Sequence, residues 1–522
     1  MSSSKPTIII RPGESEIEIL PGQSLFLALA EAGISLDQAC GGRGSCGQCR
    51  LLVLNQIPPP SSLDLKHLNE DEIRRGFRLA CELKPVGGEV IELPDGPAAV
   101  TAKEEWPDSF PVHPWPDLGP GQLVLAVDLG TTNVVGVLLD PGSGMVRSSA
   151  AVANGQAVFG ADVMTRLTYA SRGGGPARTR LQSLAFNDLA NLARALRIRP
   201  GEVGHLVGVM NSALETLLLG LDPDSLGRFP CEPPIQGPVH LILDRPEVLS
   251  GATLHIPRLV GGFVGSDAVA ALCASLSTWP RPPFLVMDVG TNTEILLMTG
   301  KGTRACSSAA GPAFEGGSIR RGMKAAAGAI MSVEAVAGRL VTRVIGDLPA
   351  KGIAGSGLFS LLGELLRLGA LDAYGVLSDR GLAPGVIREG EEGREVILSP
   401  QVAVSEGDIQ QFLLAKASAR AGLEVLLAEA GLGPRDLTAF YLCGAFARQI
   451  QGRDLLSLGL LPEMDAARIV NLGPAAAIGA AIMACSKTAF DQACGLADGI
   501  RHVRLSHHPL FQRIFSEQVR FG

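Results

Sequence analysis

The 522-residue sequence has no run of eighteen apolar residues and therefore no candidate for a membrane-spanning helix. Its first residues, MSSSKPTIII, lack the apolar core of a secretory signal peptide. Basic residues are not in excess either, because 45 Lys and Arg stand against 52 Asp and Glu, which leaves a net charge of −7. These absences predict a cytoplasmic protein that has no membrane and no nucleic-acid partner.

Cysteine occurs ten times, but the sequence has no disulfide framework. Six of the ten cysteines are scattered in apolar surroundings, which is typical of buried, reduced thiols. These six are Cys231, Cys273, Cys306, Cys443, Cys485 and Cys494. The other four form a pattern, since Cys40, Cys46 and Cys49 lie within CGGRGSCGQC and Cys81 follows in GFRLAC.

The spacing of these four cysteines is close to that of plant-type ferredoxins, which hold a [2Fe–2S] cluster through four thiolates. Three thiols within ten residues, on a loop with four glycines, would crowd one point and leave the backbone free to wrap a cluster. A zinc site is the alternative, but zinc usually shows paired CxxC motifs or His ligands, and no His is near this loop in the sequence. We therefore predict that Cys40, Cys46, Cys49 and Cys81 ligate a [2Fe–2S] cluster.

The residues around this loop agree with a small redox domain over residues 1–93. Thr7 to Ile10 and Glu16 to Leu20 are apolar-rich and predict two strands, and Gln23 to Ala32 has the periodicity of a helix. This order of strand, strand, helix and cysteine loop resembles the β-grasp ferredoxins. GFRLAC resembles the segment that carries their fourth ligand, and the five-residue gap between Cys40 and Cys46 is similar to that of adrenodoxin-type proteins.

Residues 94–121 form a proline-rich linker with seven prolines, Trp106 and Trp115. Proline-rich segments behave as semi-rigid spacers, so the linker could let the cluster move between two docking positions. Alternatively, the linker packs on the domain that follows, with both tryptophans as anchors. The sequence leaves both interpretations open.

The chain beyond the linker contains an internal repeat. Leu123 to Asp140 (LVLAVDLGTTNVVGVLLD) and Phe284 to Gly300 (FLVMDVGTNTEILLMTG) each have an apolar strand ending in Asp, a Gly-Thr turn and a second apolar strand. Backbone N–H groups in such a turn can bind phosphate oxygens. The aspartate can face Mg²⁺, which commonly takes one or two carboxylates together with phosphates and waters. The repeat therefore predicts a duplicated nucleotide site.

This duplication resembles the ATPase superfamily of sugar kinases, actin and heat-shock chaperones, in which two α/β subdomains clamp a nucleotide. The resemblance implies an α/β domain over residues 122–522, with subdomains at about 122–280 and 281–522, and ATP and Mg²⁺ as ligands. The matching phosphate-loop positions are Asp128, Gly130, Thr131, Thr132, Asp288, Gly290, Thr291 and Asn292. Gly355 in IAGSGL and Gly444 in YLCGAFA match two further nucleotide motifs, and LGPAAAIGAAI matches the late connecting helix. Ala445 stands where the adenosine motif usually has a second glycine, which makes the adenine site less certain than the phosphate site.

No general base stands out in the sequence. From their positions, Asp288 and Glu294 are the best candidates for orienting a water at the γ-phosphate, with Asp128 in the equivalent place on the first loop. The sequence does not decide which face of the sheet Glu294 occupies. Asp162 and Asp267 are secondary candidates for positioning water or Mg²⁺. Glu315 is a candidate for the cleft or the partner surface, and Lys416 for the cleft. The basic cluster Arg320, Arg321 and Lys324 could contact phosphates or an acidic partner.

Over nearly its full length the chain resembles the reductive activators of corrinoid-dependent methyltransferases. The blocks that carry the resemblance are FGADVMTRLTYA, LLLGLDP, GGFVGSDAVA, AAGPAFEGGSIRRGM, IQQFLLAKASARAGLEVLL and HHPLFQRIF. The segment NSALE departs from that family, and its Glu215 is a candidate for the partner face.

The resemblance implies an ATP-dependent reductase that returns Co(II) corrinoid to Co(I) through its [2Fe–2S] cluster. A corrinoid protein and an upstream electron donor would be its partners, and a homodimer is one assembly open to it. Two alternatives remain. The same ATP-coupled electron transfer could serve another low-potential acceptor, or the chain could be a non-catalytic nucleotide-binding redox sensor.

Overall fold

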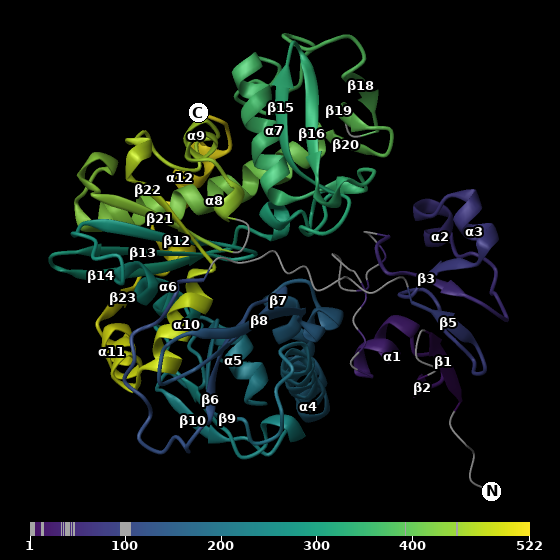
Figure 1. Cartoon of the computed structure of the whole chain (residues 1–522). Coiled ribbons are helices and arrows are strands. Elements are labelled where there is room, and N and C mark those ends of the chain that lie inside the picture. Colours follow the sequence, from purple (N-terminus) through teal and green to yellow (C-terminus); the bar gives the residue numbers. More distant parts are fainter. Residues whose placement is uncertain are drawn as a thin grey trace, which may run out of the picture.

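The computed structural model describes residues 6–11, 15–32, 34, 36, 42, 44, 47–93, 106–391, 393–444 and 447–522. Within these ranges the strands form one five-stranded, two six-stranded and two three-stranded sheets. Figure 1 shows the N-terminal domain at the right, the two six-stranded sheets at the left and below, and the three-stranded sheets at the top.

The N-terminal domain is a small mixed sheet covered by a helix, as predicted. Its strand order is β2-β1-β5-β3-β4. The strands are β1 (Thr7–Arg11), β2 (Ser15–Glu18), β3 (Arg50–Val53), β4 (Phe77–Leu79) and β5 (Val90–Glu92), and the helices are α1 (Leu25–Glu31), α2 (Ser62–His67) and α3 (Glu70–Arg75). Helix α1 begins at Ser24, whose hydroxyl accepts the Leu27 N–H, and buries Leu25, Phe26 and Leu29 against Ile8 and Ile10.

The two six-stranded sheets share one plan. Their orders are β10-β11-β9-β6-β7-β8 and β22-β21-β12-β13-β14-β23, each with an antiparallel meander beside parallel strands. The first contains β6 (Leu123–Leu129), β7 (Asn133–Leu139), β8 (Val146–Ala153), β9 (Val203–Met210), β10 (Val239–Ile242) and β11 (Thr253–Ile256). The second contains β12 (Phe284–Val289), β13 (Thr293–Thr299), β14 (Gly302–Ser308), β21 (Ala439–Cys443), β22 (Ile469–Gly473) and β23 (Ile500–His502). The predicted duplication is thus visible in the sheet topology.

Two helices connect the sheets at the centre of the molecule. Helix α6 (Ser266–Leu276) and helix α10 (Ala475–Cys485) belong to one buried apolar cluster that also takes in residues of both sheets. The helices approach so closely that a Cβ on Gly479 would lie 2.0 Å from the Ala270 carbonyl oxygen. Glycine is therefore required in α10, and the two helices join the halves of the predicted ATPase domain.

The outer helices and the two small sheets complete this domain. The helices are α4 (Val163–Ala195), α5 (Ser212–Leu218), α7 (Gly355–Leu368), α8 (Glu406–Ala430), α9 (Gly452–Ser457), α11 (Lys487–Asp498) and α12 (Phe511–Gln518). One small sheet contains β15 (Ala329–Val336), β16 (Arg339–Val344) and β17 (Gly352–Ile353), and the other contains β18 (Ile387–Gly390), β19 (Gly393–Ser399) and β20 (Val402–Ser405). Helices α4 and α5 bury apolar residues against the first large sheet, and α8 does so against the second.

The described part of the linker, residues 106–121, packs on the predicted ATPase domain. Phe110 and Trp115 are buried in the central cluster. The Trp115 indole N–H donates to the Ala484 carbonyl at 3.1 Å, and that of Trp106 donates to the Ser149 hydroxyl at 3.0 Å. Both tryptophans therefore act as anchors, which was the second of the two interpretations. Residues 94–105 lie outside the described residues.

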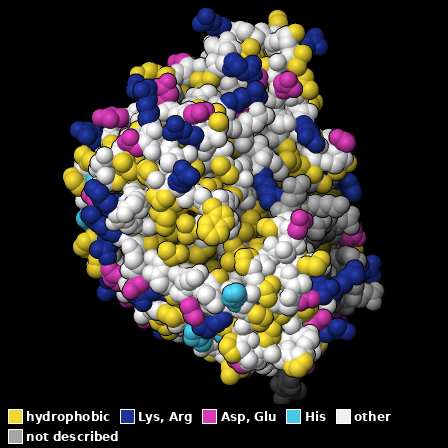
Figure 2. Space-filling model, turned by 60° about the vertical axis from the view of Figure 1, so that its left-hand side comes forward, with side chains coloured by type: hydrophobic (Ala, Val, Ile, Leu, Met, Phe, Trp, Pro, Cys, Tyr) yellow, Lys and Arg dark blue, Asp and Glu magenta, His cyan; other side chains and the backbone are white. Residues whose placement is uncertain are grey.

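Apolar side chains also reach the surface. Figure 2 shows them gathered across the middle of one face, with charged side chains around them. Among the large exposed apolar residues of the chain is Trp279, which is 90% exposed. No helix within the described ranges combines the length and the apolar character that crossing a bilayer requires.

Candidate functional site

Two of the four predicted cluster ligands are described, and strand pairing brings them together. Strands β3 and β4 pair antiparallel with Arg50 opposite Leu79, and the Ala80 N–H donates to the Cys49 carbonyl at 2.8 Å. Cys81 follows immediately, so it lies next to Cys49 although 32 positions separate them in the sequence. Cys49 is buried and Cys81 is half-buried. Cys40 and Cys46 lie outside the described residues.

Three glycines of the loop before Cys49 lie within the described residues. Gly42, Gly44 and Gly47 have φ angles of +75°, +76° and +63°, which favour glycine. His67 lies against this loop, with its Nε2 2.9 Å from the Gly44 carbonyl oxygen, and a Cβ on Gly47 would lie 2.7 Å from His67. No His is near this loop in the sequence, but the fold brings His67 to it. In space His67 holds the loop in place, and the thiol donors with the glycine turns fit a [2Fe–2S] cluster.

The first phosphate loop is a tight turn between β6 and β7. The Gly130 N–H donates to the Asn133 carbonyl at 2.9 Å, and a Cβ on Gly130 would lie 2.8 Å from that oxygen. Two residues that sequence reasoning missed support the turn. The Asn154 side-chain amide donates to the Gly130 carbonyl at 2.8 Å, and the buried Arg166 guanidinium donates to the Thr131 carbonyl at 2.6 Å. Burial lowers the pKa of Arg166 to about 10 despite the carboxylates of two nearby aspartates.

Arg166 was present in the block FGADVMTRLTYA, but nothing in its spacing points to the phosphate loop, because 35 residues separate it from Thr131. The signal that could have found it is a lone arginine on an otherwise apolar helix face. Asn211, which follows β9 and caps α5, is a further neighbour of this loop, with its amide 3.4 Å from the Thr131 hydroxyl.

The second phosphate loop is a similar turn between β12 and β13, shorter than the first by one residue. The Gly290 N–H donates to the Asn292 carbonyl at 3.1 Å. Asp288 and Glu294 are direct partners across the antiparallel pair, so both side chains lie on the same face of the sheet. The buried Thr291 hydroxyl has no hydrogen-bond partner among the described residues. This loop therefore presents two carboxyl groups and an unpaired hydroxyl.

The carboxyl groups around the second loop have strongly raised pKa values. Burial, together with the charges of Asp267 and Glu315, raises the pKa of Asp288 to about 7. Burial raises the pKa of Asp267 to about 6, and burial with the charges of Asp267 and Asp288 raises the pKa of Glu294 well above its usual range. Carboxyl groups that crowd one site and resist ionisation are typical of sites that bind a cation or move a proton.

Gly444 joins this site from β21. Its N–H donates to the Gly473 carbonyl at 2.9 Å, and a Cβ there would lie 2.6 Å from the Val289 carbonyl oxygen and 3.3 Å from an Asp288 carboxylate oxygen. With a φ of +114°, this position needs glycine for both space and backbone conformation. Ala445 lies outside the described residues, so the prediction that it narrows the adenine site stays a prediction.

Gly355 starts α7 and is packed against the segment that follows the second phosphate loop. A Cβ there would lie 1.8 Å from the Phe314 carbonyl oxygen. The hydroxyl of the next residue, Ser356, donates to the side-chain oxygen of Gln449 at 3.0 Å, which ties α7 to the turn after Gly444. The structure thus brings the predicted Gly355 and Gly444 motifs together.

Three secondary candidates do not have the roles that their sequence context indicated. Asp162 caps α4, and its two carboxylate oxygens accept from the Thr165 N–H and from the Thr165 hydroxyl at 2.8 Å each. Lys416 does not face the cleft, because its buried ammonium donates to the carbonyls of Gln518 and Arg520. Glu215 is buried and cannot contact a partner protein.

The Glu215 carboxyl group is buried without a hydrogen-bond partner among the described residues. The residue is 2% exposed. Burial and the nearby charge of Asp267 raise the pKa of Glu215 to about 8. Glu215 therefore extends the group of carboxyls around Asp267.

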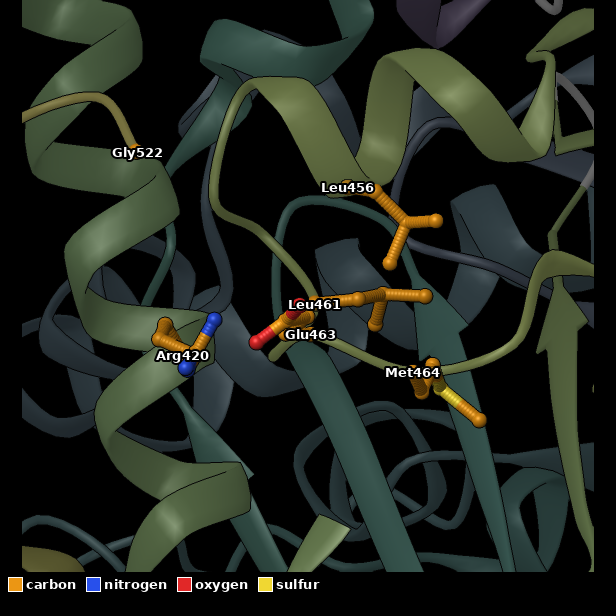
Figure 3. A pocket seen from close by; sticks show the side chains of 6 residues that line it. All are labelled: Arg420, Leu456, Leu461, Glu463, Met464 and Gly522. Atoms are coloured by element: carbon orange, nitrogen blue, oxygen red, sulfur yellow. The ribbon is translucent and has the colours of Figure 1, made fainter. Parts of the chain in front are cut away.

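A surface cavity lies away from the phosphate loops. Its lining residues are Arg420, Leu456, Leu461, Glu463, Met464 and Gly522 (Figure 3). None of the phosphate-loop residues contributes to its wall, so the cavity belongs to the C-terminal region and not to the predicted nucleotide site.

Comparison with known protein families accounts for this combination of sites. A model of the 2Fe-2S iron-sulfur cluster binding domain matches residues 8–86. A model of the RACo middle region matches residues 123–276, and one of the C-terminal domain of RACo, the ASKHA domain, matches residues 283–521. The chain belongs to the RACo family. This confirms the predicted resemblance to the corrinoid reductive activators and the predicted [2Fe–2S]-binding domain.

Individual relatives agree with the assignment. The corrinoid activation enzyme RamQ of Eubacterium limosum is 29% identical over 432 residues, which cover 76% of this chain and 70% of RamQ. The Co(II) methylated amine-specific corrinoid protein reductase of Methanosarcina barkeri is 27% identical over 291 residues, 51% of each chain. A solved structure of a reductive activator for corrinoid, iron–sulfur protein covers 99% of this RACo-family chain and 98% of its own, at 24% identity and a TM-score of 0.70. This last likeness confirms the predicted fold.

Proposed function

We propose that this RACo-family protein is an ATP-dependent one-electron reductase that returns the Co(II) form of a corrinoid protein to Co(I). The observation that carries the proposal is the union, in one chain, of a [2Fe–2S]-binding domain and a duplicated phosphate-loop domain. Relatives named for corrinoid activation and for reduction of a Co(II) corrinoid protein support the choice of substrate. An upstream electron donor would supply the electron.

The need for ATP follows from energetics. A plant-type [2Fe–2S] cluster, when bound, stores one electron at a potential of roughly −400 mV. Transfer to an acceptor with a lower potential costs about 2.3 kcal/mol for each 100 mV and each electron. Nucleotide binding or hydrolysis can supply this free energy. For this, it must change how the [2Fe–2S]-binding domain contacts the rest of the chain.

The residues that would hold the cofactors are those of the two sites described above. We assign the cluster to the thiolates of Cys40, Cys46, Cys49 and Cys81. We assign the nucleotide phosphates to the two turns and the adenosine to the region of Gly355, Gly444 and Ala445. The residues of the turns are Asp128, Gly130, Thr131, Thr132, Asp288, Gly290, Thr291 and Asn292.

Mg²⁺ and the catalytic carboxyls belong to the same proposal. Within the described ranges, no three His, Cys, Asp or Glu side chains are arranged to hold a metal by themselves. Mg²⁺ does not need such a set, because it commonly takes one or two carboxylates and completes its shell with phosphates and waters. Asp288 is the carboxyl we assign to the metal. Glu294 and Asp267 beside it would orient the attacking water. Burial raises the pKa of Asp267 to about 6, which suits proton acceptance near neutral pH.

The test is an anaerobic reduction assay with the reconstituted protein. It would be mixed with a Co(II) corrinoid protein and a strong reductant, with and without MgATP, while the cobalt absorption spectrum is followed. The proposal expects Co(I) to form only with MgATP and an intact cluster. Cys46→Ser is the control that removes electron delivery and leaves nucleotide binding in place.

Other results would identify the alternatives. Formation of Co(I) at the same rate without ATP would contradict the proposal. A reducible cluster and bound ATP, with no Co(I) from several corrinoid proteins, would favour another low-potential acceptor if ATP is hydrolysed. The same result with negligible hydrolysis would favour a redox sensor.

A further inference from the structure

The segment from Pro312 to Lys324 contacts both the nucleotide site and the [2Fe–2S]-binding domain. At one end the Thr132 hydroxyl, in the first phosphate loop, donates to Glu315 Oε2 at 2.8 Å. At the other end the Gln48 side-chain amide donates to the Gly322 carbonyl at 3.1 Å. Gln48 immediately precedes the assigned cluster ligand Cys49. Only seven positions of one segment, from Glu315 to Gly322, therefore lie between the contact with the first phosphate loop and the contact with the cluster loop.

The Glu315 carboxylate lies between the two phosphate loops. It accepts a hydrogen bond from the first loop through Thr132, and its Oε1 is 3.3 Å from the point where a Cβ on Gly290 of the second loop would lie. Its charge also contributes to the raised pKa of Asp288. Phosphates that bind the same hydroxyl and the same turn would meet this negative charge directly. A carboxylate and a phosphate compete for one donor and repel each other, so one of them must move.

The backbone of the segment forms a short path from Glu315 to Gly322. Gly316 and Gly322 touch, because a Cβ on Gly322 would lie 2.1 Å from the Gly316 carbonyl oxygen. The Gly322 N–H donates to the Ile319 carbonyl at 2.9 Å, which closes the loop between them. The two glycine backbones are in direct contact, and no side chain lies between them that could change its conformation. A shift of Glu315 and Gly316 therefore displaces Gly322 as well.

The [2Fe–2S]-binding domain contacts both halves of the ATPase domain. Gln48 reaches Gly322 in the second half, whereas Glu31 of α1 forms a 2.7 Å ion pair with Arg180 of α4 in the first half. Val158, also in the first half, packs against the apolar core of the N-terminal domain. A rigid domain that bridges two bodies cannot keep both contacts when those bodies move relative to each other.

We propose that residues 312–324 are the coupling element that transmits nucleotide occupancy to the [2Fe–2S]-binding domain, with Glu315 as its sensor. Nucleotide phosphates displace the Glu315 carboxylate from Thr132, the Gly316–Gly322 contact carries the shift, and the Gln48 contact beside Cys49 is released. This inference rests on the proposed ATP-dependent function and adds the residues through which ATP acts. No group other than the nucleotide is needed to operate it.

The test compares Glu315→Gln with the wild-type protein and with Glu334→Gln, a control at an exposed carboxyl on β15. The amide keeps an acceptor for Thr132 but removes the charge that phosphates repel. Three quantities are measured on the full reconstituted chain. They are the affinity for MgATP or a non-hydrolysable analogue, the hydrogen–deuterium exchange of residues 47–54 and 312–324 with and without nucleotide, and the midpoint potential of the cluster with and without nucleotide.

In the wild type and in Glu334→Gln, nucleotide should speed exchange in both segments and shift the midpoint potential. In Glu315→Gln the nucleotide should bind several-fold more tightly, while both responses largely disappear. Gln48→Ala tests the other end, with unchanged nucleotide affinity, faster exchange of residues 47–54 already without nucleotide, and a much smaller further increase when nucleotide binds.

Three outcomes would overturn the inference. The first is a wild-type cluster domain that does not respond to nucleotide in either readout. The second is a response in Glu315→Gln equal to that of the wild type. The third is a tenfold or larger loss of nucleotide affinity in Glu315→Gln, which would make Glu315 a ligand of MgATP and not a group that it displaces. If any of these occurs while Co(I) formation still requires ATP, the coupling path is wrong and the proposed function stands.

Discussion

Around the first phosphate loop the buried charged group that contacts the turn is a cation, Arg166, whereas carboxyl groups surround the second loop. Both turns are closed by the N–H of their glycine, which donates to the Asn133 carbonyl in the first turn and to the Asn292 carbonyl, one position nearer, in the second. The strand pairing shifts by one residue accordingly, so that Asp128 lies opposite Val135 whereas Asp288 lies opposite Glu294. The duplicated backbone thus supports two different electrostatic settings. Beside the first loop, Arg166 stabilises the turn. Beside the second loop, several carboxyl groups lie close together, which suits binding of a metal ion and proton transfer.

The largest expected effect comes from removing the central carboxyl of the second loop. Asp288→Ala should lower the rate of ATP-dependent Co(I) formation by about a hundredfold or more, because it removes the assigned Mg²⁺ ligand and a neighbour of the water-orienting carboxyls. The cluster should still be reducible, as its electron paramagnetic resonance spectrum would show. Full reduction of the acceptor at the wild-type rate would contradict ATP coupling through this loop.

Replacing Arg166, the buried cation that contacts the first phosphate loop, should lower the stability of the folded protein. Arg166→Met should lower the free energy of unfolding by about 3 kcal/mol, since it leaves Asp188 and the Thr131 carbonyl without their buried partner. Denaturant unfolding measures the change. The control is Arg147→Met, which breaks the exposed ion pair with Asp140 and should cost less than about 1 kcal/mol. Equal losses in the two variants would show that Arg166 does not support the loop.

The buried carboxyl group of Glu215 should make the stability of the folded protein depend on pH. The pKa of Glu215 is raised from 4.5 to about 8, so between these values the folded state binds more protons than the unfolded state. Stability is then greatest below the unfolded pKa and falls as pH rises toward 8, by up to roughly 1.4 kcal/mol per pH unit.

Glu215→Gln removes this titration. In calorimetry of the protein without nucleotide, the variant should gain stability over the wild type as pH rises from 5.5 to 8. A wild-type pH slope that persists unchanged in Glu215→Gln would show that this carboxyl is not held protonated by the fold.

The smallest effect comes from placing a methyl group in each turn. Gly130→Ala should destabilise the protein by about 1–3 kcal/mol, because the new Cβ would lie 2.8 Å from the Asn133 carbonyl oxygen of the rigid turn. Gly290→Ala should cost less than about 1 kcal/mol, since the nearest atom, at 3.3 Å, is the end of the Glu315 side chain. Melting temperatures of the two variants provide the comparison. If Gly290→Ala lowered the melting temperature more than Gly130→Ala, the second turn and not the first would be the one that cannot accommodate a methyl group.

Much of the fold could be predicted because its signals are local. The apolar-rich run from Thr7 to Ile10 predicts a strand, and the two Asp-x-Gly-Thr turns between apolar strands predict two similar hairpins. The cysteine spacing predicts the cluster because three of the ligands are close in the sequence. The assignment of the nucleotide contacts and of the catalytic carboxyls stays a prediction.

Other features could not be predicted because they depend on contacts between distant segments. The helix pattern around Lys416 is the same whether its ammonium faces a cleft or, as here, the carbonyls of the C-terminal segment. Asp162 in a polar context is equally compatible with a ligand and with the helix cap that it forms. His67 is far from the cysteine loop in the sequence, and only the packing of α2 brings it to Gly44.

The sequence by itself determined the elements and the chemistry that each one carries, since hydrophobic periodicity, glycine turns and thiol spacing act over a few residues. Only the tertiary structure decided which of these meet. In the folded protein, Glu294 lies on the same face of the sheet as Asp288, and the buried Arg166 contacts Thr131. Trp115 packs in the core, and Glu315 lies between the two phosphate loops. The physical reason is that these contacts join residues far apart in the chain, and the burial of apolar surface around them selects one arrangement out of many that the local pattern permits.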